Sequence, residues 1–342
     1  MREKTQLPET HLQRKGRIKL RKKDTQRFAG ISGFYSALPS PFREDGGPEL
    51  GALDALIESL LEKGVEGLCV GGMTGEYPIL DIQDRMQVFK HVAERTAGRV
   101  PLIFGVGAEC SGHILKMGML AKDLGALALL LPPPSFSNFS PQDLQEIMKD
   151  VAARLPLPVI LYNIPQFTNV LGVVNVLSLF FSVENIAGVK DSSGDRRALD
   201  QFAVAKRAAG LCLMAGNDSL LLYALEQQAN GCISGLSCMA PELMLGIYHA
   251  FQAGDKQRVL ALQALVHELV AAVNKLPVPW GIKIALEVQG FSMGPLSWPC
   301  RSRMAKRVAA FRQWYEDWAP KVRELLSEPA NFRRNDCAYE QA

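Results

Sequence analysis

The sequence predicts an α/β protein, a (β/α)8 TIM barrel with a C-terminal helical appendage. Three observations lead to this prediction. Apolar runs alternate with helical segments eight times between Gly30 and Gly254, which matches the barrel in count and length. No Gly-x-Gly-x-x-Gly sequence follows the first run, which disfavours the competing doubly wound open sheet. After Gly254 the pattern contains helices only, which predicts the appendage.

The expected strands are short apolar runs bounded by Gly, Pro or Asn. They are residues 33–38, 67–71, 101–105, 126–131, 159–162, 187–190, 211–215 and 231–234. The helices expected between and after them are 49–63, 81–96, 111–123, 141–153, 172–182, 196–208, 218–228, 241–252, 255–274, 279–289 and 303–327. Several have start signals, among them Ser140 before Pro141 and Asp195 before the sixth helix.

The chain divides into four expected segments: a basic extension (1–28), the barrel (29–254), a three-helix appendage (255–327) and a tail (328–342). Residues 1–27 contain ten Lys or Arg against three acidic residues, with few apolar side chains and no periodicity. This composition predicts disorder, with a nucleic-acid or partner arm as the alternative. Because the rest of the chain is mildly acidic, we expect no nucleic-acid partner.

Composition narrows the class of protein further. The chain has no apolar run of the length that spans a bilayer, so we expect no membrane contact. Its seven cysteines contain no CxxC pair and several lie in apolar runs, as in a protein of the reducing cytoplasm. The five histidines show no metal-ligand spacing. We therefore expect a cytoplasmic protein without a metal or cofactor.

Two expected strands deliver reactive side chains at their C-terminal ends, where active sites of such barrels lie. The fifth ends in Tyr162 and the sixth in Lys190. Burying an unpaired ammonium is costly, and covalent amine chemistry needs the neutral amine that attacks a carbonyl. Neighbouring strands would place both groups on one cavity. Taken singly, the tyrosine could be packing and the lysine could extend to solvent.

Loops at three other strand ends add polar groups. The second strand leads into Gly71-Gly-Met-Thr-Gly-Glu76, whose amides and Thr74 hydroxyl could hold an anion, although a Gly-Gly loop is also a common turn. The eighth ends in Gly231-Cys-Ile-Ser-Gly235, a second backbone-rich loop. After the seventh lies Asp218, whose alternative role is to cap the following helix. An amine, a phenol and a carboxylate cradle together suit Schiff-base chemistry on a 2-oxo acid.

Three motifs resemble those of one known family. Gly72-Met-Thr-Gly-Glu76, Leu161-Tyr-Asn-Ile-Pro165 and Gly188-Val-Lys-Asp-Ser-Ser-Gly194 are similar to the signatures of the dihydrodipicolinate synthase / N-acetylneuraminate lyase family of class I aldolases. The similarity extends over about residues 30–320 in order and spacing. It implies a carbon–carbon lyase that assembles as a homotetramer of tight dimers, or as a homodimer.

The resemblance also implies roles for individual residues. Lys190 would form the Schiff base with pyruvate and Tyr162 would transfer protons. Thr74 and neighbouring amides from Gly72 onward would bind the pyruvate carboxylate, and Ile233 would contact substrate through its backbone. By comparison with the lyase branch, Ser192 and Asp218 would contact the acceptor part of the substrate.

Three departures from the synthase pattern bear on the acceptor. Met73 replaces a hydroxyl residue that belongs to a proton relay in the synthases, and Phe167 replaces an arginine that binds a substrate carboxylate. Pro132-Pro-Pro-Ser-Phe136 replaces a tyrosine pair, one of which reaches across the dimer. We expect Met73, Phe167 and Phe136 to make a less polar pocket.

The sequence therefore predicts an aldolase or lyase that forms or cleaves a 2-keto-3-deoxy sugar acid or a 4-hydroxy-2-oxo acid through Lys190. The first alternative is 4-hydroxy-tetrahydrodipicolinate synthase, which condenses pyruvate with aspartate semialdehyde. Further alternatives are a dehydratase acting on a keto-deoxy sugar acid through the same lysine and a ligand-binding homologue without turnover.

Overall fold

The chain folds into a closed barrel of eight parallel strands in sequence order, β1-β2-β3-β4-β5-β6-β7-β8. The computed structural model describes residue 28 and residues 30–327 of the 342, so the predictions for the basic extension and the tail lie outside the described residues. The strands are Gly33–Ala37, Gly67–Val70, Leu102–Gly105, Ala128–Leu131, Val159–Asn163, Ile186–Asp191, Cys212–Ala215 and Gly231–Ser234. The predicted barrel is confirmed.

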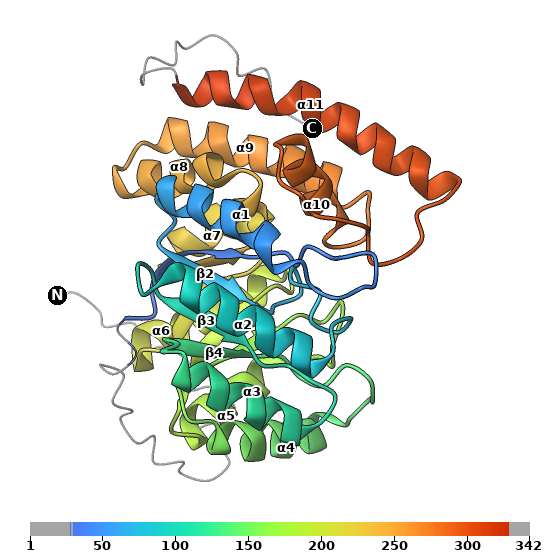
Figure 1. The fold of residues 1–342 in the computed structure, drawn as a ribbon. Coiled ribbons are helices and arrows are strands. Elements are labelled where there is room, and N and C mark those ends of the chain that lie inside the picture. The colour runs from blue at the N-terminus through green and yellow to red at the C-terminus, as the bar shows by residue number, and fades with distance from the viewer. Residues whose placement is uncertain (1–27, 29, 328–342) are drawn as a thin grey trace, which may run out of the picture.

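Helices surround the barrel and continue past it. After strands β1 to β6 come α1 (Leu50–Glu62), α2 (Ile82–Thr96), α3 (Ser111–Asp123), α4 (Pro141–Arg154), α5 (Val173–Ser182) and α6 (Arg196–Ala209). Then follow η2 (Asp218–Leu220), α7 (Leu221–Glu226), η3 (Leu236–Cys238), α8 (Pro241–Gln252), α9 (Lys256–Val273), α10 (Trp280–Val288) and α11 (Arg303–Ser327). Figure 1 shows α9, α10 and α11 gathered on one side of the barrel, beside α8.

Most predicted element ends agree with the structure within two residues, and the start signals act as expected. The Ser140 hydroxyl accepts a hydrogen bond from the amide of Asp143, and Asp195 caps α6 through the amide of Arg197. The seventh helix differs from the prediction, because it begins as the short 3-10 helix η2 and its α-helical part ends at Glu226.

The core has two layers, because strand side chains alternate between the barrel interior and the helices. One layer fills the barrel interior and includes Tyr35, Ile103 and Ile160. The other lies between the strands and the helices and contains most of the buried aliphatic side chains. The buried cysteines of the strands are unpaired.

An irregularity between β5 and β6 sets the direction of the side chains at the barrel mouth. Val159 pairs with Ile186, but Ile160 pairs with Gly188, so β6 holds one extra residue, Ala187. Such a bulge shifts the alternation of the strand that carries it. Beyond it, Tyr162 pairs with Lys190. The two side chains therefore leave neighbouring strands on the same face.

Candidate functional site

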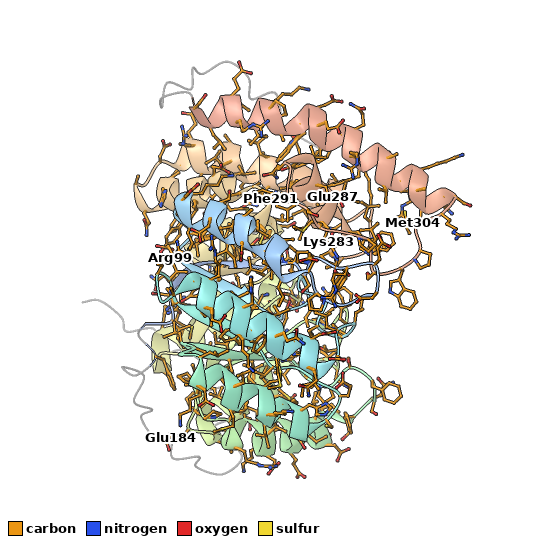
Figure 2. All side chains as sticks on the ribbon, viewed as in Figure 1. Arg99, Glu184, Lys283, Glu287, Phe291 and Met304 are labelled. Carbon is orange, nitrogen blue, oxygen red and sulfur yellow. The ribbon has the colours of Figure 1, made fainter. Side chains whose placement is uncertain are left out.

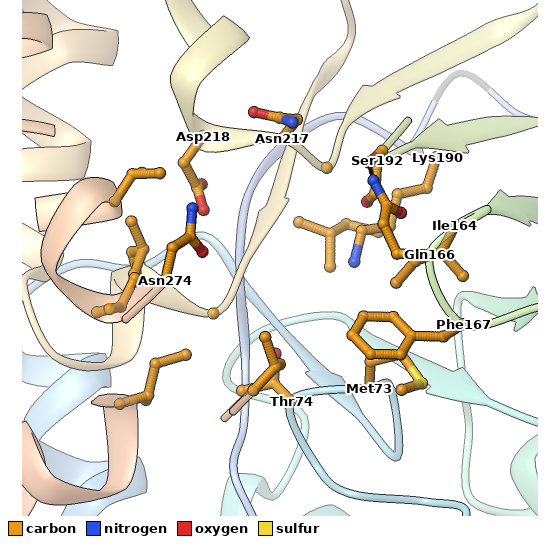
Figure 3. Close-up of a pocket in the computed structure, with 18 of the residues that line it drawn as sticks. Met73, Thr74, Ile164, Gln166, Phe167, Lys190, Ser192, Asn217, Asp218 and Asn274 are labelled. Atoms are coloured by element: carbon orange, nitrogen blue, oxygen red, sulfur yellow. Dashed lines mark hydrogen bonds between the residues drawn. The ribbon is translucent and has the colours of Figure 1, made fainter. Parts of the chain in front are cut away.

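A cavity of about 410 Å³ opens at the C-terminal ends of the strands (Figure 3). Side chains from β5, β6, the loops after β2 and β7, and the appended helices line it. The lining residues are Met73, Thr74, Tyr162, Ile164, Gln166, Phe167, Lys190, Ser192, Gly216, Asn217, Asp218, Ile233, Gly235, Leu236, Val270, Val273, Asn274, Val278 and Ile282. Of the residues singled out from the sequence, all but Gly72 and Phe136 lie on this surface.

Lys190 and Tyr162 meet at the centre of this surface. Both are buried, and the Lys190 ammonium lies 4.2 Å from the centroid of the Tyr162 ring. Within the described part of the chain, Lys190 has no carboxylate within ion-pairing distance, and Figure 3 shows its amine directed into the cavity. The prediction that these two groups face one cavity is confirmed.

Gly216, after β7, provides the space that the lysine side chain occupies. A Cβ atom at this position would lie 2.8 Å from Lys190 Cε and 2.1 Å from Ser192 Oγ. Ser192 is buried beside the lysine, and its hydroxyl has no hydrogen-bond partner among the described residues. Ser192 therefore has an unused donor and acceptor beside the amine.

A hydrogen-bond network fixes the end of β6. The Asn163 amide donates to Asp191 Oδ1 at 2.6 Å, and the Ser193 hydroxyl donates to Asp191 Oδ2 at 2.8 Å. Burial raises the pKa of Asp191, and these hydrogen bonds oppose the rise. Because Asp191 directly follows Lys190, this network limits movement of the lysine backbone.

The loop after β2 brings a hydroxyl and a thioether to the cavity. Met73 and Thr74 line it, whereas Gly72 is buried behind them and its carbonyl accepts a hydrogen bond from the Gly75 amide at 3.0 Å. Ile233 of β8 also lines the cavity. The structure thus places Thr74 where the sequence predicted an anion-binding group.

Asp218 faces the cavity rather than capping a helix. The cap of η2 is Asn217, whose side chain accepts a hydrogen bond from the Ser219 amide at 3.1 Å, so the capping alternative for Asp218 is wrong. Burial raises the pKa of Asp218 to about 6, and a hydrogen bond from Ser234 and the charge of Lys190 oppose the rise. The cavity therefore contains a carboxyl group that releases its proton at a higher pH than an ordinary aspartate does.

Charge is sparse on the cavity surface. Among its lining residues Lys190 is the sole basic side chain and Asp218 the sole acidic one. Phe167 lines the cavity near Met73, as expected from the sequence (Figure 3). Phe136 does not: it is 97% exposed and borders a different cavity, of about 450 Å³, near Tyr77 and Phe139. The expectation for Phe136 is wrong because its side chain points to solvent instead of into the cavity that Lys190 lines.

Sequence reasoning missed polar residues that complete the cavity. Asn274, at the end of α9, points its amide toward Asp218 in Figure 3, and no described residue forms a hydrogen bond with that amide. Gln166 donates to the Ser192 carbonyl at 3.2 Å. Asn274 carries no local signal in the sequence, because only packing of the appendage brings it to the barrel mouth. Gln166 follows the Tyr162 motif directly and could have been included.

Two general properties of the described region bear on function. The described residues contain no cluster of three or more His, Cys, Asp or Glu side chains that could hold a metal ion. Within the same part of the chain, no helix is both long enough and apolar enough to cross a bilayer.

Comparison with known proteins gives a consistent set of relatives. The model of the dihydrodipicolinate synthetase family matches residues 30–312. A 4-hydroxy-tetrahydrodipicolinate synthase of Moorella thermoacetica is 33% identical, over 81% of this chain and 96% of that protein. An uncharacterized DapA-like lyase of Halobacterium salinarum is 32% identical, over 80% of this chain and 89% of that protein.

Solved structures agree in fold. Dihydrodipicolinate synthase from Aquifex aeolicus superposes with a TM-score of 0.78 at 26% identity, covering 84% of this chain and 98% of that one. N-acetylneuraminate lyase from Mycoplasma synoviae gives a TM-score of 0.74 at 23% identity, covering 84% and 97%. The second similarity concerns the fold alone.

Proposed function

The chain belongs to the dihydrodipicolinate synthetase family of lyases, and we propose that it is a Schiff-base aldolase that joins pyruvate to, or releases it from, an uncharged hydroxylated aldehyde. The observation that carries this proposal is the pairing of Lys190 and Tyr162 in a cavity whose described lining residues include no second basic side chain. The product or substrate would be a 2-keto-3-deoxy sugar acid or a related 4-hydroxy-2-oxo acid.

The proposed chemistry begins at the Lys190 amine. Its neutral form attacks the ketone carbon of pyruvate, and loss of water gives a protonated imine. That positive charge acidifies the pyruvate methyl group, so removal of one proton gives an enamine. The enamine carbon then forms the new bond to the aldehyde carbon while the aldehyde oxygen takes up a proton. Water finally cleaves the imine and restores Lys190.

The proton transfers in this sequence are assigned to Tyr162. Its ring lies beside the Lys190 amine, so its hydroxyl can reach groups attached to the imine carbon. The substrate carboxylate is assigned to Thr74 and the amides around it, because this loop lies on the cavity surface. Ile233 also lines the cavity, where it would contact the substrate.

The acceptor assignment follows from charge. Among the described lining residues, the one basic side chain, Lys190, forms the imine, and the one acidic side chain is Asp218, so an aldehyde bearing a carboxylate would meet no further cation there. Hydroxyl groups meet better partners there: the unpaired Ser192 hydroxyl, the Asn274 amide and the Asp218 carboxyl. A hydroxylated uncharged aldehyde therefore fits this end of the cavity.

Reductive trapping tests the proposal. The protein is incubated with pyruvate, reduced with borohydride and digested, and the peptide containing Lys190 is analysed by mass spectrometry. We expect a pyruvyl adduct on that lysine. Folded protein that gives no adduct with pyruvate would overturn the proposal.

A second arm of the experiment identifies the acceptor. Pyruvate is supplied with glyceraldehyde, glycolaldehyde or aspartate semialdehyde, and the initial rate of pyruvate consumption is measured for each. We expect turnover with the uncharged aldehydes. Trapping of pyruvate together with turnover on aspartate semialdehyde alone would assign the synthase activity that several relatives carry in their names.

We also propose that the protein assembles as a homodimer or homotetramer. Support comes from the exposed apolar side chains Phe136 and Phe139, which border a surface cavity beside Tyr77. Sedimentation velocity at micromolar concentration tests this: a single monomeric species would contradict it.

A further inference from the structure

A second buried lysine lies behind the loop that carries Thr74. Lys283 of α10 is 0% exposed, and its ammonium lies 3.0 Å from a carboxylate oxygen of Glu76, which is 4% exposed. The ammonium also lies 3.9 Å from the centroid of the Phe42 ring. Figure 2 places Lys283 where α10 meets the barrel. The pair thus connects the appendage to the loop after β2.

Stability alone is a poor explanation for this pair. Removing two charges from water costs several kcal/mol per ion, and apolar replacements of buried pairs are often neutral or stabilising. Burial lowers the pKa of Lys283, whereas the Glu76 charge opposes that change. The second carboxylate oxygen of Glu76 has no hydrogen-bond partner among the described residues. An ion pair fixes the direction in which the Glu76 side chain points, which apolar packing does not do.

Glu76 ends a tightly wound turn. Its φ angle is +53°, in the left-handed region that a residue other than glycine rarely occupies. The Gly75 amide donates to the Gly72 carbonyl and the Glu76 amide to the Met73 carbonyl, each at 3.0 Å. Thr74 therefore lies inside two overlapping turns, and the position of Glu76 determines where they end.

A residue after β8, Gly235, lies beside both this loop and α10. At Gly235, an added Cβ atom would lie 2.7 Å from Thr74 Oγ1 and 2.8 Å from Ile282 Cδ1, so both side chains close on this glycine. Ile282 immediately precedes Lys283 and lines the cavity. Two consecutive residues of α10 thus lie close to the Thr74 loop: Lys283 is ion-paired with Glu76, and Ile282 lies beside Gly235, which Thr74 also adjoins.

We infer that Lys283 is a positioning residue: through Glu76 it holds the turn that carries Thr74 in the conformation that receives the substrate carboxylate. The part of this inference that concerns the carboxylate rests on the proposed function. Lys283 itself does not reach the cavity, because it is fully buried and closed off by Phe42.

The test replaces the pair by neutral groups of similar size. The double variant Glu76→Gln/Lys283→Met leaves no lone buried charge, whereas Lys283→Met alone would strand Glu76. The matched control is Lys63→Met/Glu242→Gln, which neutralises a pair of 2.9 Å whose side chains are 31% and 48% exposed. Amide hydrogen exchange of residues 72–77 and the pyruvate concentration for half-maximal trapping are measured for each protein.

We expect faster exchange in this loop alone, by about tenfold, and an approximately tenfold higher half-maximal pyruvate concentration in the double variant. The maximal trapping rate should stay within about threefold, which separates positioning from loss of chemistry. Glu76→Gln alone would leave the buried Lys283 ammonium without a counter-charge, so it is not used as a comparison. The control pair should behave as the unmodified protein.

Unchanged exchange and unchanged pyruvate dependence in a folded double variant would overturn the inference. Should that variant not fold, Glu76→Asp decides, because it keeps both charges but withdraws the carboxylate by one methylene; wild-type exchange and pyruvate dependence there would also overturn it. Failure of the unmodified protein to trap pyruvate would reject the proposed function, whereas the exchange measurement would still test the link between Lys283 and the loop.

Discussion

Lys190 and Lys283 occupy similar surroundings in two regions of the molecule, the end of β6 and the middle of α10. Both are buried, and each ammonium lies over an aromatic ring, Tyr162 at 4.2 Å and Phe42 at 3.9 Å. The two lysines differ in whether a carboxylate lies close to the ammonium group. Glu76 lies 3.0 Å from Lys283, whereas no described carboxylate lies within ion-pairing distance of Lys190.

This difference separates a structural lysine from a reactive one. The Lys283 ammonium is fully buried between Glu76 and Phe42, so a substrate cannot reach it. The Lys190 amine faces an open cavity, where a carbonyl substrate can reach it. The rings differ as well, because Tyr162 carries a hydroxyl that can move protons and Phe42 does not.

The largest effect is expected at Lys190 itself. Lys190→Ala should lower turnover on the order of 10⁴-fold or more, because the covalent nucleophile is lost. It should also abolish the borohydride-trapped adduct, as measured by peptide mass spectrometry. The peptide that contains Lys283 serves as the internal control for Lys190 and should stay unmodified in every sample. An adduct on Lys283 would show that burial and pairing do not protect it.

The aromatic partner gives the next largest effect. Tyr162→Phe makes the surroundings of Lys190 resemble those of Lys283, since only the hydroxyl is removed. We expect turnover to fall by about 10²–10⁴-fold, the range for loss of a general acid–base group. The pyruvyl adduct should still form on Lys190, at a lower rate.

The matched control for this variant is Tyr223→Phe. Tyr223 carries its hydroxyl on the protein surface, where it donates to Asp200. Its loss should leave turnover unchanged. If Tyr162→Phe behaved like this control, the proton-transfer role of Tyr162 would be wrong, and the two aromatic partners would be equivalent.

Much of the candidate site could be predicted from the sequence because its residues belong to short segments that can be recognised one at a time. Tyr162 and Lys190 lie near the ends of short apolar runs and Thr74 lies in the loop after another, so all three could be placed at the barrel mouth from their order alone. Because β5 and β6 are neighbouring parallel strands, Tyr162 and Lys190 lie next to each other. The bulge at Ala187, which fixes their common direction, has no clear sequence signal.

The parts that could not be predicted depend on contacts between distant segments. Lys283 and Glu76 are 207 residues apart, and nothing near either one indicates the other. Asn274 reaches the cavity only because α9 packs beside the barrel. Phe136 was expected to line the pocket but does not. An apolar residue after a strand can point outward as readily as inward, and the path of the loop decides which.

A second cation beside Lys190 should change the choice of acceptor. Phe167 lines the cavity and is 44% exposed, so an arginine there has room to extend. Phe167→Arg should raise the relative rate with a carboxylate-bearing aldehyde by about 10–100-fold, since a charged hydrogen bond contributes about 1.5–3 kcal/mol. Competition between glyceraldehyde and aspartate semialdehyde measures this ratio. Phe167→Leu is the control, and an equal shift there would indicate an effect of space rather than charge.

The smallest effect concerns the Asp218 carboxyl group, which shares the cavity with Lys190. Burial raises the pKa of Asp218 to about 6, above its ordinary value of 3.8. Between these values the folded protein binds a proton that the unfolded chain has released. Asp218 therefore contributes stability that is fully present below about pH 4 and is lost as the pH rises through about 6.

Asp218→Asn should remove this part of the pH dependence, because an amide stays neutral. Urea midpoints at pH 4, 5, 6 and 7 would show the wild-type protein losing stability relative to the variant between pH 4 and 6. Asp150→Asn, at a carboxylate that is 68% exposed, is the control and should run parallel to the wild type. A constant difference between wild type and Asp218→Asn would mean that Asp218 stays ionised throughout. Lys190 would then share its cavity with a charged carboxylate, and the contrast between the two lysines would reduce to their access to that cavity.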